Sequence, residues 1–440
     1  MIRFAIQLLD WLTTARVHYF LLFFLCAWLT WLIKVLLSTL YRPSGAAHTA
    51  IASVVIPTVD EPPELFREVL RRISDQHPHE VIVVINGPRN DALERVCAEF
   101  SIVRQIWIPE AGKRNAIRMG VEAATGEIVV LSDSDTVWEV NALSELLKPF
   151  ADSKVGGVAA HAKIWRPKRS LWTRFASWME DFRTSYSLPA SSIWGQVGCL
   201  PGRTIAIRRQ LVVDSLPQFM NETFLGIHLE ISDDRSLTNF VLLKGFKTVY
   251  QRSSIVYTDA PVLPFKFIRQ QYRWAKGSQY NSLKMLPWML RNAWFLAFGY
   301  TTDIALSFFL IGVYVNFAWP VVHANNGQTS GIVLTQYLLL SLVGGTLGMA
   351  LKQPRRLIED PIEILLLPFY WLIVVFILTP VRLWGFVRMG YDEAWGTRQN
   401  AYAGSAKRSL LRWVPPMIAL SIFAFFVILG PIVESWSHKN

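Results

Sequence analysis

The stretch that decides the fold runs from residue 53 to residue 135. It contains four short apolar runs: SVVIP at 53–57, VIVVI at 81–85, QIWIP at 105–109 and EIVVLSDSD at 127–135. Amphipathic segments with helical spacing lie between them, at Glu64 to Ser74, Ala92 to Glu99 and Lys113 to Ala124. This alternation predicts β–α units, and therefore a mostly parallel sheet with helices on both faces. The soluble part to which the stretch belongs extends from Ile51 to about Tyr257.

The composition is that of a membrane protein with a sizeable soluble part. The 440-residue chain is 52% hydrophobic, 13% aromatic and 18% charged, and its mean hydropathy is +0.28. These values exclude a disordered chain and argue against an ordinary soluble enzyme. The net charge of +11 comes from 44 Lys+Arg against 33 Asp+Glu. Because most of this excess flanks apolar segments, we assign it to membrane topology and expect no nucleic-acid partner.

The cysteines exclude one class of protein and favour one compartment. Cys26, Cys97 and Cys199 are too few and too scattered for a disulfide framework or a zinc site. A reduced globular part that faces the cytosol is the simplest interpretation.

Apolar segments on both sides of the soluble part predict four spans of ~30 Å of hydrocarbon. We expect them at about Val17 to Tyr41, Asp303 to Val322, Gly331 to Leu351 and Val414 to Val433. The first sixteen residues have the pattern of an interfacial helix. If the apolar stretch from Pro361 to Pro380 also crossed, the basic loops on its two sides would face opposite sides of the membrane. We therefore expect this stretch to be interfacial or re-entrant, broken by Pro368 and Pro380. Both chain termini then lie outside the cytosol.

Two amphipathic helices are expected outside the spans. Residues Lys168 to Phe182 place six apolar side chains on one stripe beside basic residues: Leu171, Trp172, Phe175, Trp178, Met179 and Phe182. Such a stripe can pack into a core, but its Trp and Arg content favours a helix at the membrane surface. An aromatic and basic helix from Pro264 toward Met289 is the second.

Two motifs of the soluble part have residues suited to a nucleotide diphosphate. Asp133 and Asp135 end the fourth apolar run, and carboxylates at i and i+2 of a strand end can hold a divalent cation against a diphosphate. The alternative is a helix N-cap, because an amphipathic helix follows at Asn141. Lys113 and Arg114 open a helix, where a phosphate could bind to the amide groups and the ammonium. The alternative there is a solvated basic turn.

Two further motifs have residues suited to catalysis and to sugar binding. In Asp233-Asp234-Arg235, one carboxylate can accept a proton while the other is structural. The alternative is a cap on the helix from Ser236 to Leu243. In Gln270-Gln271-Tyr272-Arg273-Trp274, the indole offers a flat apolar face to a sugar ring, and Arg273 can pair with diphosphate oxygens. The alternative, an interfacial amphipathic helix, is compatible with this role.

The order of these motifs, D-x-D, then D-D-R, then Q-x-x-R-W, resembles that of the processive family 2 glycosyltransferases of the GT-A fold. Within them the chain is most similar to hyaluronan synthases and to chitin and chitin-oligosaccharide synthases. Supporting stretches are Val54-Val55-Ile56-Pro57-Thr58, Ala111-Gly112-Lys113-Arg114, Phe224-Leu225-Gly226-Ile227 and Ser232 to Asn239. Trp395-Gly396-Thr397-Arg398 resembles the family's gating-loop motif. The resemblance covers about Ser53 to Arg398.

The resemblance implies a cytosolic α/β GT-A domain, Rossmann-like, inserted between transmembrane and interfacial helices. Expected boundaries are 1–45 for an interfacial and a transmembrane helix, 46–260 for the GT-A domain, 261–292 for interfacial helices, and 293–440 for transmembrane or re-entrant helices. It also implies a role for each matching residue. Asp234 would be the catalytic base, and Asp133 and Asp135 would hold Mg²⁺ or Mn²⁺. The nucleotide-sugar would be bound by Thr58, Glu61, Asn86, Lys113, Asp133, Gln270, Arg273, Trp274, Trp395, Thr397 and Arg398.

The acceptor would be bound by Trp274, Cys199, Arg203 and Asp233. The chain departs from the family at one predicted donor position and one predicted acceptor position. Asn86 stands where the family usually has an aspartate that binds uracil. Arg203 adds a positive charge near the expected acceptor site, where it could favour an acidic sugar.

The resulting expectation is a membrane enzyme that transfers hexoses from UDP-sugars to a growing polysaccharide with inversion, and that secretes the polymer. The alternative is a non-processive enzyme that adds a sugar to a lipid acceptor. A transporter without transferase activity is disfavoured for two reasons. Lys34 and Asp303 are the only charged residues in or at the ends of the expected spans, and no ATP-binding motif is present. Expected partners are UDP-sugar donors, the acceptor and lipids of the plasma or inner membrane.

Overall fold

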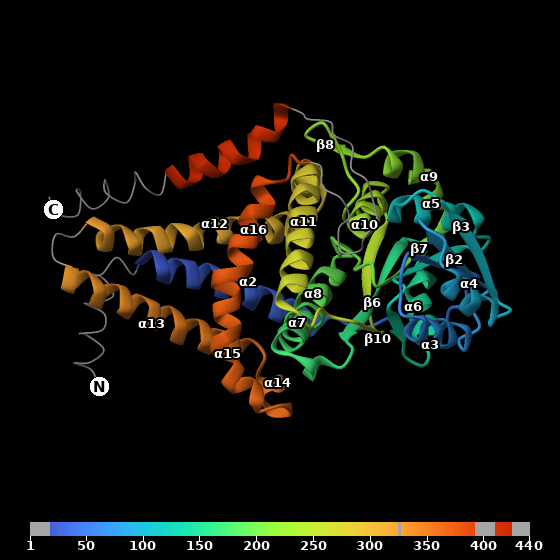
Figure 1. Ribbon diagram of the computed structural model, residues 1–440, viewed down its shortest axis with the longest axis horizontal. Coiled ribbons are helices and arrows are strands. Elements are labelled where there is room, and N and C mark those ends of the chain that lie inside the picture. The colour runs from blue at the N-terminus through green and yellow to red at the C-terminus, as the bar shows by residue number, and fades with distance from the viewer. Residues whose placement is uncertain (1–17, 324–326, 392–409, 425–440) are drawn as a thin grey trace. The chain divides into compact units, whose positions relative to one another are not determined.

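The computed structural model describes residues 18–323, 327–391 and 410–424 (Figure 1). The described residues divide into two compact units. One unit contains residues 34–297 with 390–391 and 410–412, and the other contains residues 18–33, 298–323, 327–389 and 413–424.

The first unit is built on an eight-stranded mixed sheet with the order β3-β2-β1-β4-β7-β6-β10-β5. The strands are β1 (Ala52–Thr58), β2 (Glu80–Asn86), β3 (Val103–Ile108), β4 (Ile128–Ser132), β5 (Thr136–Trp138), β6 (Val155–Ile164), β7 (Thr204–Arg208) and β10 (Lys247–Thr258). Strands β3, β2, β1 and β4 pair in parallel, which confirms the predicted alternation of strands and helices. Strand β7 is antiparallel to both β4 and β6, and β10 is antiparallel to β5, so the sheet as a whole is mixed.

Helices cover both faces of this sheet. They are α3 (Pro63–Ser74), α4 (Asp91–Ala98), α5 (Lys113–Ala123), α6 (Ala142–Leu147), α7 (Leu171–Phe182), α8 (Leu188–Ile193), α9 (Arg209–Met220) and α10 (Asp233–Leu243). Helix α11 (Pro264–Asn292) packs against α10. A short hairpin of β8 (Thr223–Phe224) and β9 (Ile227–His228) precedes α10. Because side chains alternate along a strand, Val54 packs with α3 and α4 whereas Val55 packs with α5, α9 and α10. Gly120 lets α5 approach β1, since a Cβ there would lie 2.3 Å from Val55 Cγ1.

Helix α7 packs into this unit more than its composition indicated. Phe175 and Trp178 are buried, and the rings of Trp172 and Phe175 lie 5.3 and 5.9 Å from the ring of Phe267 on α11. These contacts favour the core-packing alternative over a helix lying on the membrane surface. A π-helical turn, Arg183–Ser187, follows α7 directly.

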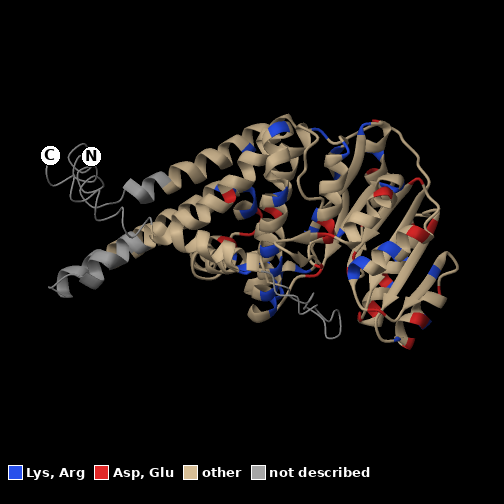
Figure 2. Ribbon diagram, turned by 90° about the horizontal axis from the view of Figure 1, so that it is seen from above, with Lys and Arg blue, Asp and Glu red and all other residues tan. Residues whose placement is uncertain are grey.

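The second unit consists of apolar helices. Its main elements are α2 (His18–Leu40, which continues into the first unit), α12 (Trp294–His323), α13 (Gly327–Lys352), α14 (Pro354–Glu359), α15 (Ile362–Ile373) and α16 (Thr379–Val387). Among the described residues, three segments are long and apolar enough to cross a membrane: Phe23–Leu40, Trp294–Tyr314 and Ile362–Val387. Shorter apolar helices lie at Leu338–Lys352 and Leu410–Ala424. Charged residues are frequent on the sheet unit and sparse along the long apolar helices (Figure 2).

The expected break between Pro361 and Pro380 is not found. Helix α15, a π-helical turn (Val374–Leu378) and α16 form one continuous helical run of span length. Proline lacks an N–H group, and the widened turn before Pro380 accommodates it, with the Thr379 hydroxyl donating to Val374 O at 2.9 Å. The expected N-terminal interfacial helix lies outside the described residues, as does the end of the span expected to finish at Val433.

Candidate active site

The D-x-D motif forms a tight turn at the carboxyl end of β4. Asp133 N–H donates to Arg203 O at 3.0 Å, and Thr136 N–H donates back to Asp133 O at 3.1 Å. Strand β5 starts directly after Asp135, and the next helix, α6, is preceded by Asn141. The helix-cap alternative for Asp133 and Asp135 is therefore wrong, and both half-buried carboxylates remain at the sheet edge.

Lys113 joins two of the predicted motifs. Its ammonium lies 2.8 Å from Asp133 Oδ1 and 3.1 Å from Asp233 Oδ2. Burial alone would lower the pKa of Lys113, but Asp133 and Asp233 outweigh it and the pKa is raised. Lys113 is the first residue of α5 and follows Gly112, whose φ of +147° suits glycine. The solvated-turn alternative for Lys113 is wrong.

Asp234 has the environment expected of a general base. Its Oδ2 accepts from Gly202 N–H at 3.0 Å and its Oδ1 from Arg235 N–H at 2.7 Å. Burial and the neighbouring Asp233 raise the pKa of Asp234. Burial also acts to raise the pKa of Asp233, but Lys113 outweighs it and the pKa is lowered. Two adjacent carboxylates are thus driven apart in basicity, which is the arrangement typical of paired acid and base roles.

Two of the predicted acceptor residues lie beside Asp234: Cys199, and Asp233, which precedes it in the chain. Cys199 Sγ lies 3.8 Å from Asp234 Oδ2, and burial followed by the charge of Asp234 raises the pKa of the thiol to about 12. Trp274 on α11 is 43% exposed, and the guanidinium of Arg203 lies 5.7 Å from the centroid of its ring. Gln270 and Arg273 share the helical face of Trp274 by their spacing. Trp395, Thr397 and Arg398 lie outside the described residues.

The remaining residues predicted to bind the donor, Glu61 and Asn86, connect to the same edge. Glu61 accepts from Ser134 Oγ, inside the D-x-D turn, at 2.6 Å. Asn86 is 1% exposed, and both ends of its amide are used within the protein: Nδ2 donates to Thr58 O, and Oδ1 accepts from Gly112 N–H. Asn86 thereby ties the end of β1 to the residue before Lys113.

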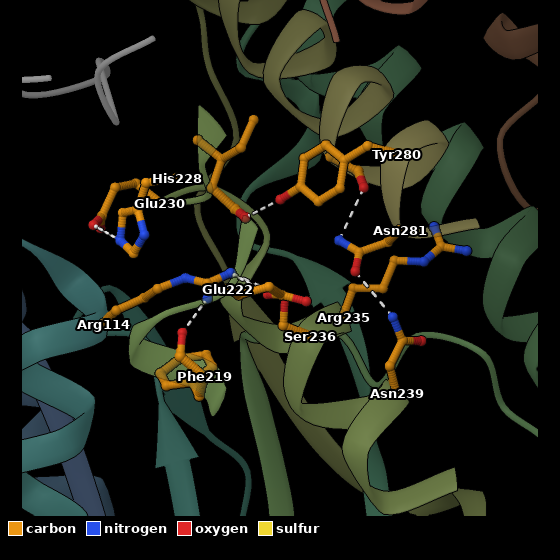
Figure 3. A network of polar contacts seen from close by, with 12 residues as sticks. Arg114, Phe219, Glu222, His228, Glu230, Arg235, Ser236, Asn239, Tyr280 and Asn281 are labelled. Carbon is orange, nitrogen blue, oxygen red and sulfur yellow. Dashed lines mark hydrogen bonds and ion pairs between the residues drawn. The ribbon is translucent and has the colours of Figure 1, made fainter. Parts of the chain in front are cut away.

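Arg114 anchors the helix that carries Lys113 (Figure 3). Its buried guanidinium donates to Phe219 O at 2.5 Å, to Glu222 Oε2 at 2.9 Å and to Ser236 Oγ at 2.9 Å. Glu222 also accepts from Lys284 Nζ on α11 at 2.7 Å. Burial alone would raise the pKa of Glu222, but Arg114 and Lys284 outweigh it and the pKa is lowered. Lys113 faces the site while Arg114 holds α5 against α9, α10 and α11.

The start of α10 is fixed against α11 by several polar contacts, and Figure 3 shows those of Tyr280 and Asn239. They are Arg235 to Ser278 and Ser282, Tyr280 to Ile231 O, and Asn239 to Asn281. Ser232, which precedes Asp233, has a φ of +65°, and it leaves no room at Gly277, where a Cβ would lie 2.7 Å from the Ser232 Cβ. The start of α10, with Asp234, and the helix of Trp274 are therefore held together. The helix N-terminus at Asp233 has no side-chain cap, so the capping alternative for Asp233 and Asp234 is wrong.

Sequence reasoning missed Glu180, Arg183 and Glu222. Glu180 forms ion pairs with Arg203 at 2.5 Å and with Arg183 at 2.6 Å. Glu180 follows Trp178 and Met179 in α7 and stands three residues before Arg183, a spacing that could have indicated an ion pair. Glu222 and its partner Arg114 are far apart in the chain, and no local pattern indicates their contact.

This fold corresponds to that of a glycosyltransferase. The chain matches the family described as "Glycosyltransferase like family 2" over residues 49–277, and it belongs to that family. It is 30% identical over 381 residues to a hyaluronan synthase of Streptococcus pyogenes serotype M1, which covers 84% of this chain and 88% of the relative. It is also 30% identical over 253 residues to an N-acetylglucosaminyltransferase of Rhizobium meliloti, covering 56% of this chain and 59% of the relative.

A solved structure agrees with the fold. Mannosyltransferase PcManGT from Pyrobaculum calidifontis, in complex with GDP-Man and Mn2+, superposes with a TM-score of 0.58 at 18% identity, covering 85% of this chain and 99% of that one. At this identity the likeness concerns the fold, and it confirms the predicted GT-A class.

The Arg114 anchor makes a prediction about stability. Replacing Glu222 by Gln leaves the guanidinium of Arg114 buried without its counter-charge, and breaking a buried pair from one side costs about 3–5 kcal/mol. We expect the free energy of unfolding to fall by about that amount, seen as a lower thermal midpoint of the purified protein in detergent.

A matched control is Glu99→Gln, because the ion pair of Glu99 with Arg67 is exposed to solvent. Exposed pairs contribute little, so the control should keep the wild-type midpoint. Equal midpoints for the two variants would show that the Arg114 network does not hold the unit together.

Proposed function

We propose that this chain is a membrane-embedded inverting glycosyltransferase that polymerises UDP-sugars into a β-linked polysaccharide, hyaluronan-like or containing GlcNAc, and secretes it. The observation that carries the proposal is the position of Lys113 between Asp133 and the Asp233–Asp234 pair. A cationic diphosphate site and a general base thus lie at one sheet edge, beside an exposed indole.

Asp234 would act as the base. An acceptor hydroxyl beside Asp234 gives its proton to the carboxylate while its oxygen attacks the anomeric carbon of the donor sugar. The bond to the diphosphate breaks on the opposite side, so the configuration inverts and UDP leaves with the electron pair. A raised pKa makes Asp234 a stronger base than an ordinary aspartate. The ammonium of Lys113 would stabilise the negative charge that develops on the diphosphate.

Asp133 and Asp135 would hold Mg²⁺ or Mn²⁺. Carboxylate oxygens suit these hard cations. Asp133 Oδ1 already forms an ion pair with a cation, the ammonium of Lys113. Among the described residues no group of three or more His, Cys, Asp or Glu side chains is arranged to hold a metal, so diphosphate oxygens and water would supply the other ligands. When bound, the cation would neutralise charge on the leaving diphosphate.

The membrane helices support the polymerase over a simple transferase. The similarity to the streptococcal hyaluronan synthase covers 84% of this chain, more than the sheet unit alone. Three described segments have the length and hydropathy of spans. The sheet unit would face the cytosol, where UDP-sugars would be bound, and the polymer would leave through the helices. A lipid-acceptor transferase is the alternative, because it would use the same base and diphosphate site.

The product distinguishes these two functions. We expect purified protein given UDP-GlcNAc, UDP-GlcA and UDP-Glc, singly and in pairs, to form chains of many sugars, measured by mass analysis. A lipid that carries a single sugar would contradict the polymerase, and turnover of none of the donors would contradict the transferase as proposed.

The Asp233–Asp234 pair predicts a specific pH dependence. The base must be ionised, so kcat/KM should fall as pH drops through the raised pKa of Asp234. Asp233→Asn removes the negative neighbour that helps to raise this pKa, and we expect the acidic limb of the pH profile to move to lower pH.

The control is Asp234→Asn, which should lose transfer by at least about a thousandfold and still bind UDP in calorimetry. Wild-type turnover in Asp234→Asn would remove it as the base. An unmoved limb in Asp233→Asn would show that the limb reports another group.

Removal of divalent cations should stop transfer, because Asp133, Asp135 and the diphosphate would be left without the charge that joins them. We expect activity to vanish with EDTA and to return with Mg²⁺ or Mn²⁺, measured as UDP release. Full activity after exhaustive chelation would refute the metal role.

A further inference from the structure

The dipeptide Gly202–Arg203 lies where three parts of the site meet. Gly202 N–H donates to Asp234 Oδ2 at 3.0 Å, and Arg203 O accepts from Asp133 N–H at 3.0 Å. The Arg203 guanidinium lies 5.7 Å from the ring centroid of Trp274. The base, the D-x-D turn and the exposed indole are thus linked through two adjacent residues.

The guanidinium of Arg203 is itself held in place. Glu180 Oε2 lies 2.5 Å from Arg203 Nη1, and Glu180 Oε1 lies 2.6 Å from Arg183 Nη2. The side chain of Glu180 is 7% exposed and that of Arg203 is 12% exposed. Burial alone would raise the pKa of Glu180, but the two guanidiniums outweigh it and lower the pKa to about 2. Glu180 is therefore ionised at any physiological pH, and its ion pair with Arg203 persists.

Whereas the guanidinium of Arg203 is paired and largely buried, the side chain of Trp274 is exposed to solvent. It is 43% exposed, and an exposed indole on a helix can change rotamer unless a neighbour restrains it. A guanidinium near an aromatic ring attracts it and favours one orientation. Arg203, fixed from behind by Glu180, is placed to supply that restraint.

We propose that Arg203 is a positioning residue, which the buried carboxylate of Glu180 holds against Trp274 so that the indole keeps the orientation needed to receive the terminal sugar of the acceptor. Arg203 acts through Trp274 and does not itself contact the sugar. This inference rests on the proposed function. It also replaces the expectation that the charge of Arg203 selects an acidic sugar, because that charge is already paired with Glu180.

The test separates acceptor use from donor use. Arg203→Met keeps the bulk of the side chain and removes its charge. With the UDP-sugar that the wild type uses fastest, and GlcNAc-terminated or GlcA-terminated oligosaccharides as acceptors, we expect the acceptor KM to rise about five- to tenfold. The donor KM and the rate of donor hydrolysis by water should stay within about twofold, because Asp133, Lys113 and Asp234 are untouched. Arg203→Lys should recover part of the loss, since an ammonium near the ring is also attractive.

Glu180→Gln tests the indirect route. If Glu180 acts through Arg203, the double variant Glu180→Gln/Arg203→Met should be no worse than Arg203→Met alone. The matched control is Arg166→Met, since Arg166 lies 6.0 Å from the ring centroid of Trp165 and is expected to leave the acceptor KM unchanged.

The outcomes are distinct. A wild type that transfers no sugar would overturn the proposed function and this inference together. A wild type that transfers sugar, with an unchanged acceptor KM in Arg203→Met, would overturn this inference alone. Loss of binding of only the GlcA-terminated acceptor would also overturn it, because that result assigns Arg203 to direct recognition of a carboxylate. Losses in acceptor and donor KM of equal size would show a general structural role.

Discussion

The ammonium of Lys113 is the charge on which the site depends. Asp133, Asp233 and Asp234 all act on it, and three carboxylates gathered at one half-buried edge would repel one another without it. Its place follows from the start of α5 directly after Gly112. It follows also from Arg114, which points the other way and is bound by Glu222. Lys113 contacts the carboxylates of the site, and Arg114 stabilises the packing of α5.

The residues of the site are carried by two parts of the fold, the parallel half of the sheet and the helix pair α10 and α11, which we call the two supports. The D-x-D turn belongs to the parallel half of the sheet, where β1 and β4 pair. The base and the indole belong to α10 and α11, which are fixed to each other through Arg235, Asn239 and Tyr280. Lys113 and the Gly202–Arg203 dipeptide both link these supports. A diphosphate that draws Lys113 toward itself would therefore change the charge felt by the base.

The sequence allowed the parallel half of the sheet to be predicted because its strands are uninterrupted apolar runs separated by amphipathic helices. Strand β7 could not be predicted in the same way, since Thr204–Arg208 is short and its antiparallel pairing with β4 depends on contacts far along the chain. The motifs predicted Lys113, Asp133 and Asp234 as candidate residues from local patterns, and the structure brings the three together. The ion pairs of Glu180 with Arg203 and of Glu222 with Arg114 depend on tertiary packing. The proline rule failed at Pro380, where a π-helical turn preserves the helix.

The contact between Ser232 and Gly277 has a consequence for how this family varies. A side chain at position 232, held at a φ of +65°, occupies the space that a Cβ at position 277 would need. Of the two positions, only one can carry a side chain at this spacing between α10 and α11. Related sequences should therefore show covariation: glycine at the position of Gly277 wherever a side chain precedes the paired aspartates, and larger residues there only where glycine takes the place of Ser232.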